Sequence, residues 1–430
     1  MSDSKFSNEA WFQRAKKSLP GGVSSPVRSF NAVGGIPFTA VKGYGAFIED
    51  VENNKYLDFV QSYGASILGH AHPKVVEAIK SATDNGTTFG ATTPNEIELA
   101  ERIKDRVAGV ELLRFVSSGT EATMSAIRTA RGATNREKIV IFSGCYHGHS
   151  DFLLAAGGSG LASLVIPSTN GVPKSYVEHT VVATYNELPI IDSDVAAVIV
   201  EPIAANMGLV EPEKNFLSEL RKICDSAGAL LIFDEVITGF RVAKGGASEL
   251  FNVRPDLWCF GKIIGGGLPL AAFGGRRDIM EELAPVGKVY QAGTLSGNPV
   301  AAAAGCAVLD LLEDDSYKIL KSKVTTLATG LREVIGQRGI AVSVPQVETL
   351  LGVFFGPNQV KNFESAKESA NTGKYKQFFH EMLNENVSLA PGPYEVMFTS
   401  LAHTDPDITK TVEAADAAAF KMSKTEFLSY

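Results

Sequence analysis

Two runs of sequence decide the fold, Ala229-Leu230-Leu231-Ile232-Phe233-Asp234-Glu235 and Phe260-Gly261-Lys262-Ile263-Ile264-Gly265-Gly266-Gly267. The first is a short apolar stretch that stops at two acidic residues, which is the pattern of a strand buried on both faces of a parallel sheet. Asp234 then lies at the carboxyl end of that strand, where open parallel sheets bind their ligands. The second run places Lys262 among glycines and isoleucines.

Lys262 has the surroundings of a reactive amine. Burial lowers the pKa of a lysine, so that the free amine can attack a carbonyl and form a Schiff base. The three glycines that follow Ile264 let the backbone pass close to a flat ligand. A lysine and a carboxylate that serve one cofactor indicate pyridoxal phosphate, whose ring nitrogen the carboxylate keeps protonated. These two features alone leave an alternative open, a strand-end salt bridge beside a flexible glycine loop.

Length and composition indicate a soluble globular protein of two or three domains, with 430 residues of which 45% are hydrophobic. The formal net charge of -8 argues against nucleic acid as the main partner, because a phosphate-binding face gives a basic balance. Neither a signal peptide nor a membrane-spanning run is visible, so we expect a cytoplasmic protein that binds no membrane. The four cysteines lack the spacing of a zinc site or a disulfide framework.

Helices and strands alternate from about residue 73 onward, which is typical of βαβ units around a mainly parallel sheet. Helices are expected at 73–83, 94–106 (with Thr93 as cap), 119–132, 215–226 and 298–312. Strands are expected at 112–116, 138–142, 195–200, 229–233 and 257–260.

The two ends of the chain follow a different pattern. A helix at 7–18 precedes a hairpin, 46–50 and 56–59, around Asn53-Asn54. After residue 312 we expect a helix at 316–336, a strand at 349–355, a helix at 363–385, extended pieces near 387–400 and a helix at 405–424. The expected organisation is an N-terminal segment (1–65) that packs with the small domain, a large domain (66–312) and a small α+β domain (313–430).

A candidate phosphate site follows the strand at 112–116. There, Ser117-Ser118-Gly119-Thr120-Glu121 opens a helix. Backbone N–H groups, hydroxyl donors and the positive end of the helix dipole favour a phosphate. A plain N-cap is the alternative; it explains the hydroxyl but not the glycine. A second candidate ligand loop precedes the helix at 298–312 and reads Gln291-Ala292-Gly293-Thr294-Leu295-Ser296-Gly297-Asn298-Pro299.

Two histidine pairs and one loop have open interpretations. In the run Gly144-Cys145-Tyr146-His147-Gly148-His149, Tyr146 has a ring that could stack on a cofactor. This H-x-H spacing recurs at His70 and His72, but no acidic or cysteine partner stands at ligand spacing, which favours structural or cofactor-proximal histidines over a metal. The glycine-bearing loop at 153–175 is either a lid or an ordinary surface excursion.

Together these motifs resemble the class III, fold type I pyridoxal phosphate-dependent aminotransferases. The resemblance rests on Ser118-Gly119-Thr120, Tyr146-His147-Gly148-His149, Asp234-Glu235-Val236 and Gly261-Lys262-Ile263-Ile264-Gly265-Gly266-Gly267-Leu268-Pro269. Within that family the chain is similar over nearly its whole length to the glutamate-1-semialdehyde 2,1-aminomutases, through Pro20-Gly21-Gly22-Val23-Ser24-Ser25-Pro26-Val27-Arg28, the 290–299 loop and Phe398-Thr399-Ser400-Leu401-Ala402-His403-Thr404. The resemblance implies an α/β fold type I protein, whose large domain has a mainly parallel sheet flanked by helices and is joined to a smaller α+β domain.

The resemblance also implies roles for the matching residues. Lys262 is expected to be the Schiff-base lysine and Asp234 the partner of the pyridinium nitrogen. The other cofactor-binding residues are expected to be Ser118, Gly119 and Thr120 at the phosphate, Tyr146 on the ring, Asn206 beside the cofactor, and Thr294 at the phosphate in the partner subunit of a homodimer. The substrate side is expected to comprise Arg28, as partner of a carboxylate, with Tyr63, Ser159 and Glu395. Tyr63 and Ile237 differ from the residues usual at these positions, and no metal is expected.

The implied reaction is an intramolecular amino transfer that converts (S)-glutamate 1-semialdehyde into 5-aminolevulinate through 4,5-diaminovalerate, in tetrapyrrole (porphyrin) biosynthesis. The enzyme would be an isomerase that uses pyridoxal 5'-phosphate and pyridoxamine 5'-phosphate. Expected partners are the small-molecule substrate, a second copy of the chain and, in transient contact, the enzyme that produces the semialdehyde. Two alternatives share the cofactor residues: an intermolecular class III aminotransferase for ω- or β-amino acids with 2-oxoglutarate, and a catalytically silent cofactor-binding protein.

Overall fold

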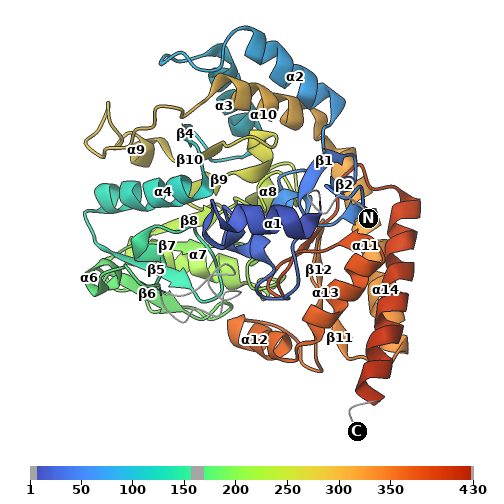
Figure 1. Ribbon diagram of the computed structural model, residues 1–430. Coiled ribbons are helices and arrows are strands. Elements are labelled where there is room, and N and C mark those ends of the chain that lie inside the picture. Colours follow the sequence, from blue (N-terminus) through green and yellow to red (C-terminus); the bar gives the residue numbers. More distant parts are fainter. Residues whose placement is uncertain (1–6, 156–168, 428–430) are drawn as a thin grey trace.

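A seven-stranded sheet lies at the centre of the protein (Figure 1), whose computed structural model describes residues 7–155 and 169–427. The strand order is β4-β10-β9-β8-β7-β5-β6. The predicted strands are β4 (Leu112–Val116), β5 (Lys138–Phe142), β7 (Val195–Val200), β8 (Leu230–Asp234) and β9 (Leu257–Phe260). Strands β5 to β9 are parallel, which confirms the mainly parallel sheet.

Two strands of this sheet were not predicted, β6 (Thr180–Ala183) at one edge and β10 (Ala271–Gly275) near the other. Strand β10 is antiparallel to both β4 and β9. Its sequence ends in two glycines, because neighbouring backbone comes very close: a Cβ atom on Gly275 would lie 2.1 Å from the carbonyl oxygen of Asp256. Without large β-branched side chains, this segment lacks the usual signal of a strand.

Helices cover both faces of the sheet, which explains why its strands are apolar throughout. Alternate residues of β5 face opposite clusters: Ile139 and Ile141 pack toward α4 (Gly119–Thr134), and Val140 and Phe142 pack with the other face. That other face also receives α7 (Phe216–Ala227), α3 (Pro94–Arg106) and α10 (Pro299–Leu311). Helix α2 (Pro73–Asp84) packs on α10, and a capping box of Thr93 and Glu96 begins α3.

Short elements complete this part of the chain. They are η4 (Gln61–Gly64), η5 (Asp151–Leu153), α6 (Lys174–Val177), α8 (Gly246–Leu250), η6 (Lys262–Gly265) and α9 (Arg277–Met280).

Three helices dominate the C-terminal part, α11 (Asp314–Gln337), α13 (Lys374–Asn384) and α14 (Asp405–Phe427), which lie together on the right of Figure 1. The predicted helix at 363–385 is wrong in one respect, because it is two helices. The first, α12 (Phe363–Asn371), ends before Gly373, whose φ of +71° a continuous helix does not allow.

The predicted strand at 349–355 is also wrong, because it is split between two small sheets. Strand β13 (Leu350–Leu351) pairs with β12 (Gln346–Val347) and β16 (Met397–Phe398), whereas β14 (Phe354–Phe355) pairs with β11 (Val342–Ser343). The break falls at Gly352, where a Cβ atom would lie 2.8 Å from that of Leu209. The chain therefore changes sheets where a neighbour comes too close for a side chain.

The N-terminal segment packs on the C-terminal part. After α1 (Asn8–Lys16) and the short turns η2 (Pro20–Gly22) and η3 (Pro26–Ser29), strands β1 (Ala40–Tyr44), β2 (Phe47–Asp50) and β3 (Lys55–Asp58) form a sheet with β15 (Val387–Ser388). The predicted hairpin is thus confirmed as β2 and β3. Phe30, Leu57 and Phe59 share one apolar cluster with α11, α13 and α14. The domain boundaries at residues 65 and 312 stay a prediction.

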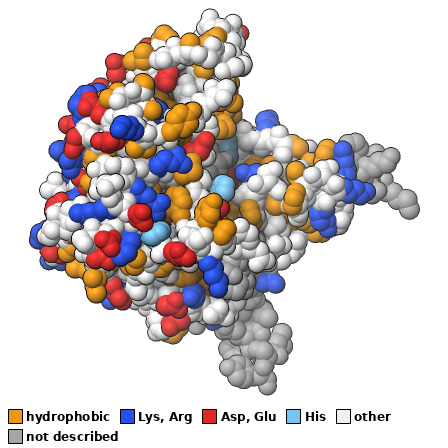
Figure 2. All heavy atoms as spheres, turned by 90° about the vertical axis from the view of Figure 1, so that its left-hand side faces the viewer, with side chains coloured by type: hydrophobic (Ala, Val, Ile, Leu, Met, Phe, Trp, Pro, Cys, Tyr) orange, Lys and Arg blue, Asp and Glu red, His pale blue; other side chains and the backbone are white. Residues whose placement is uncertain are grey.

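The face of the molecule in Figure 2 shows acidic and basic side chains interspersed over its surface. This mixture agrees with the modest net charge of -8, and no single-sign patch dominates that face. Within residues 7–155 and 169–427, every helix is too short or too polar to cross a membrane.

Candidate active site

Asp234 and Lys262, the two residues singled out first, line the same cavity of about 280 Å³. Asp234 is the last residue of β8, and Lys262 follows β9, the adjacent parallel strand. Because parallel strands end at the same edge, residues that follow neighbouring strands come together there. Asp234 thus lies at the carboxyl edge of the sheet, as predicted, and the structure brings Lys262 to the same edge.

The Asp234 carboxylate is fixed by two hydrogen bonds. Its Oδ2 atom lies 2.7 Å from Nδ1 of His147, and its Oδ1 atom accepts the backbone N–H of Val236 at 3.1 Å. Both Asp234 and His147 are buried, at 5% and 4% exposure. Thr123 also donates to the His147 carbonyl at 2.6 Å, which anchors the histidine to α4. A buried carboxylate held by these hydrogen bonds keeps one orientation.

Lys262 is an amine with a reduced pKa. Burial lowers the pKa of Lys262, and the negative charges of Asp234 and Glu201 oppose that shift. The residue also has a φ of +48°, in the left-handed region that non-glycine residues rarely adopt. Strained backbone of this kind is typical of functional sites. The environment therefore favours a neutral, nucleophilic amine at this position.

The predicted phosphate residues lie at the amino end of α4, on the wall of the same cavity. Ser118 also serves as the N-cap of α4, because its Oγ atom accepts the N–H of Glu121 at 3.2 Å. The Oγ1 atom of Thr120 lies 3.1 Å from the Nδ1 atom of His149. Gly148 has to be glycine, since a Cβ atom there would lie 2.5 Å from Oγ1 of Thr120. The N-cap is thus observed, and the phosphate site at the same helix end stays a prediction.

A buried carboxylate, Glu201, positions two of the predicted cofactor residues. Its Oε1 atom accepts the backbone N–H of Tyr146 at 2.6 Å and the side-chain amide of Asn206 at 2.8 Å. Its Oε2 atom accepts the N–H of Ala205 at 2.8 Å. Burial raises the pKa of Glu201. Tyr146 and Asn206 are thereby held at the cavity wall by one acidic group.

A second cavity, of about 630 Å³, adjoins the first. Both cavities are lined by Tyr146, Asn206, Ile237 and Lys262. The second is also lined by the predicted substrate-side residues Arg28, Tyr63 and Glu395, together with His149 and Phe398. Burial and the nearby Glu395 charge raise the pKa of Tyr63, which keeps its hydroxyl protonated.

The structure does not place the other two predicted residues, Ser159 and Thr294, in these cavities for different reasons: one is not described, and the other lies elsewhere. Ser159 lies outside the described residues, as does most of the loop at 153–175, although Leu154 and Thr169 line the larger cavity. Thr294 is exposed, between β10 and α10, and lines neither cavity. Its predicted role is to contact the cofactor phosphate in the partner subunit of a homodimer.

Glu201 was not predicted as a site residue, and His147 was expected only to be a structural or cofactor-proximal histidine, yet the contacts of both organise the site. The H-x-H spacing around His147 raised a metal site as one interpretation, whereas its ring bonds to the Asp234 carboxylate. Glu201 follows directly after β7. The rule that pointed to Asp234, a polar residue directly at the carboxyl end of a buried parallel strand, applies to Glu201 as well.

The residues present fit a pyridoxal phosphate group. Such a group needs an amine for its aldehyde, an acid for its ring nitrogen, an aromatic face and an anion site. Lys262, Asp234, Tyr146 and the amino end of α4 supply these four features around one cavity.

Sequence comparison agrees with this chemistry. Residues 30–417 match the family described as Aminotransferase class-III. The chain is 52% identical over 421 residues to a protein of Syntrophobacter fumaroxidans (strain DSM 10017 / MPOB) named glutamate-1-semialdehyde 2,1-aminomutase, covering 96% of this chain and 97% of that one.

Solved structures agree too. An omega-transaminase from Sphaerobacter thermophilus superposes with a TM-score of 0.88 at 31% identity, over 98% of this chain and 99% of the other. The PLP internal aldimine form of Sphingopyxis sp. MTA144 FumI protein superposes with a TM-score of 0.86 at 25% identity, over 98% and 97% of the two chains.

Proposed function

The chain belongs to the class III aminotransferase family, and from this premise we propose that it converts (S)-glutamate 1-semialdehyde into 5-aminolevulinate by intramolecular amino transfer. The enzyme is then an isomerase, a glutamate-1-semialdehyde 2,1-aminomutase of tetrapyrrole (porphyrin) biosynthesis, that works through 4,5-diaminovalerate. The 52% identical relative with that name supports this assignment over the 31% identical omega-transaminase.

The cofactor is pyridoxal 5'-phosphate, exchanging with its pyridoxamine form. When bound, it supplies an electron sink for charge that develops at the carbon beside its nitrogen. Asp234 would pair with the ring nitrogen, and His147 fixes the orientation of that carboxylate. Ser118, Gly119 and Thr120 would hold the phosphate at the amino end of α4. Tyr146 would cover one face of the ring, and Asn206 would lie beside it.

The observation that supports this function most is the position of Lys262, which lines both cavities. An amine shared by the cofactor and substrate spaces can take a proton at its Nζ atom from one carbon and return it to another. Because burial lowers the pKa of Lys262, the neutral form of the Nζ atom, which can accept that proton, is favoured. Both halves of an intramolecular transfer can then use a single base.

The larger cavity suits a small acid with an amino and a carbonyl group. Arg28 would pair with the substrate carboxylate, since a guanidinium matches a carboxylate in two hydrogen bonds. Tyr63 and Glu395 would contact the rest of the substrate, and the Ser159 hydroxyl would also lie on the substrate side. Retention of the diamine matters, because its escape would leave the cofactor in the wrong form for the next substrate.

We also infer a homodimer in the cytoplasm. Thr294 would reach the cofactor phosphate in the partner subunit, which fits its exposed position away from the cavities of its own chain. Tyr290 and Leu295, on the same loop, are 72% and 53% exposed, which supports a covered surface there. Transient contact with the enzyme that supplies the semialdehyde is part of the same proposal.

The alternative is an intermolecular aminotransferase that acts on ω- or β-amino acids with 2-oxoglutarate, favoured by the similarity to the omega-transaminase. The two functions differ in their need for a second substrate. Holoenzyme should form no glutamate from 2-oxoglutarate with β-alanine or another ω-amino acid as donor. Steady glutamate formation in that assay would favour the alternative.

A further inference from the structure

Arg241 is a fully buried arginine, 0% exposed, and no carboxylate of the described residues forms an ion pair with it. Its Nη2 atom donates to the Gly64 carbonyl at 2.8 Å, and its Nη1 atom donates to the Thr399 carbonyl at 3.3 Å. In the described part of the chain its Nε atom has no hydrogen-bond partner. Burial lowers the pKa of Arg241 to about 9. A charge buried without a counterion is costly, so its retention calls for a reason.

Both carbonyls belong to segments that line the substrate cavity. Gly64 follows Tyr63 and Thr399 follows Phe398, and both aromatic residues line that cavity. The guanidinium also lies over the Phe398 ring, 5.2 Å from its centroid, within the range of a cation–π contact. One side chain therefore connects two walls of the cavity that are far apart in the sequence.

The segment that presents Tyr63 is strained. Gln61, Ser62 and Tyr63 have φ values of +45°, +53° and +56°, a left-handed conformation that costs free energy for residues other than glycine. Gly64 follows with a φ of +99°, and a Cβ atom there would lie 2.8 Å from the Phe398 ring. Consecutive left-handed residues of this kind persist only where surrounding contacts hold them.

Asp58 supplies such contacts at the start of this turn. Its carboxylate accepts the N–H groups of Val60 and Gln61 at 2.9 and 3.1 Å, and Nε2 of His70 lies 2.7 Å from it. Gln61 also donates its side-chain amide to the Asp58 carbonyl at 2.9 Å. At the other end of the turn, the hydrogen bond that Arg241 donates to the Gly64 carbonyl holds the backbone in the same way.

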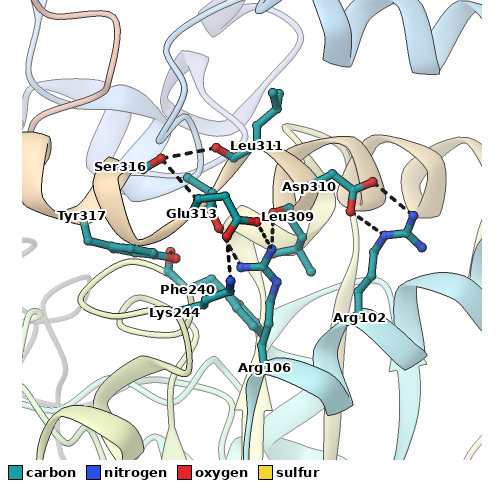
Figure 3. A network of polar contacts seen from close by, with 11 residues as sticks. Arg102, Arg106, Phe240, Lys244, Leu309, Asp310, Leu311, Glu313, Ser316 and Tyr317 are labelled. Atoms are coloured by element: carbon teal, nitrogen blue, oxygen red, sulfur yellow. Dashed lines mark hydrogen bonds and ion pairs between the residues drawn. The ribbon is translucent and has the colours of Figure 1, made fainter.

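The loop that carries Arg241 is itself anchored on both sides of this residue, as Figure 3 shows. The Tyr317 hydroxyl of α11 donates to the Phe240 carbonyl at 3.1 Å. On the other side of Arg241, Lys244 pairs with Glu313 at 2.7 Å, and Arg106 of α3 approaches the same carboxylate at 3.7 Å. The backbone on both sides of Arg241 is therefore held in place, and the Arg241 side chain extends from it to the cavity walls.

We propose that Arg241 is a positioning residue that ties the strained Tyr63 turn to the Phe398 segment and so sets the shape of the substrate cavity. The proposal rests on the function given above only in the identity of the substrate. Arg241 lines neither cavity, so it acts through the walls rather than by contact with substrate or cofactor. Its loss should therefore weaken substrate binding more than cofactor binding.

The test is amide hydrogen exchange by mass spectrometry on wild-type holoenzyme and on two variants, Arg241→Met and Arg241→Lys. Met keeps the approximate length of the side chain without charge or donors, and Lys keeps the charge and one set of donors. In Arg241→Met, exchange should be faster by about tenfold or more in peptides spanning 60–66 and 396–401, because two charge-assisted bonds are lost. Arg241→Lys should lie between this variant and wild type.

Kinetics with glutamate 1-semialdehyde provide the second readout. Arg241→Met should raise KM by about tenfold or more while kcat changes by less than about threefold and cofactor content stays at wild-type level. A fall in kcat at unchanged KM would overturn the proposal. So would unchanged exchange in both peptides, or acceleration spread evenly over the whole chain.

A matched control is Arg221→Met. Arg221 is also largely buried, but it pairs with Asp256 at 2.7 Å, away from both cavities. This variant should leave exchange at 60–66 and 396–401 unchanged. If Arg241→Met does not fold, Arg241→Lys provides the test. Unchanged exchange in peptides 60–66 and 396–401 of that variant would refute the positioning role of Arg241. If wild type does not turn over the semialdehyde, the proposed function fails and the exchange data alone judge Arg241.

Discussion

The Nδ1 atom of His147 lies 2.7 Å from the Oδ2 atom of Asp234, and both side chains are buried at the floor of the cofactor cavity. Two residues from separate βα units are thus joined into one acid–imidazole pair. The histidine fixes the carboxylate that would serve the ring nitrogen, so the pair acts as a unit.

Replacing His147 by Ala should lower kcat about 10- to 100-fold at saturating cofactor, because a hydrogen bond to a charged group is lost. The measurement is turnover of glutamate 1-semialdehyde together with cofactor content. His179→Ala is the matched control, since His179 is half-exposed and pairs with the exposed Glu137. Equal rates in His147→Ala and wild type would show that the pair does not support catalysis.

Replacing Lys262 by Ala should retain the cofactor yet lower turnover at least about 100-fold, because the shared acid–base group is gone. Cofactor release on denaturation and product formation measure the two effects separately. Lys138→Ala, at an exposed ion pair with Asp192, should behave like wild type. A wild-type rate in Lys262→Ala would refute the assigned role.

Replacing Glu201 by Gln should weaken cofactor binding by about tenfold or more. The new amide group would face at least one of the three N–H donors that Glu201 now accepts, from Tyr146, Ala205 and Asn206. Titration of apoenzyme with pyridoxal phosphate, followed by absorbance, measures the affinity. Glu178→Gln, an exposed site, is the control. Unchanged affinity would mean that Glu201 positions neither residue.

His403 should make the protein acid-sensitive. It is 0% exposed, and burial lowers the pKa of His403 to about 4, below the usual value near 6.5. As pH falls from 6.5 toward 4, the unfolded chain binds a proton that the native imidazole does not, so stability is lost, by about 2 kcal/mol at pH 5.

The measurement is the thermal unfolding midpoint of holoenzyme at pH 7 and pH 5. His403→Gln cannot titrate and should lose less stability between these two values than wild type does. His179→Gln, half-exposed, should match wild type. Equal pH dependence in His403→Gln and wild type would contradict the buried neutral histidine.

The sequence predicted the parts of the fold in which local pattern and tertiary environment agree. Buried apolar runs became β7, β8 and β9, and Thr93 capped α3 as expected. The strand β10 was not predicted because Gly275 is required by close packing against the Asp256 backbone and Gly274 by close packing against the Leu112 backbone, which only the folded sheet reveals. The helix at 363–385 was predicted as continuous because the break at Gly373 depends on one left-handed residue.

The site was predictable to a similar degree. Asp234 was identified by its position at the end of a strand and Lys262 by its glycine and isoleucine neighbours, and the structure brings them to one cavity. Arg241 could not be recognised, because nothing in its sequence neighbourhood shows that its guanidinium will bond to the carbonyls of Gly64 and Thr399. Contacts between distant segments are decided by packing rather than by local pattern. Roles that depend on such contacts therefore emerge only from the folded chain.

The most direct test of the central claim is a single-substrate assay. Purified holoenzyme receives glutamate 1-semialdehyde with no amino donor or acceptor, and 5-aminolevulinate is followed over many turnovers. Sustained formation of 5-aminolevulinate is the expected result, because an intramolecular transfer regenerates the cofactor form that it starts from. Absence of product, with a cofactor absorbance band that responds to other amines, would contradict the aminomutase and favour an intermolecular aminotransferase.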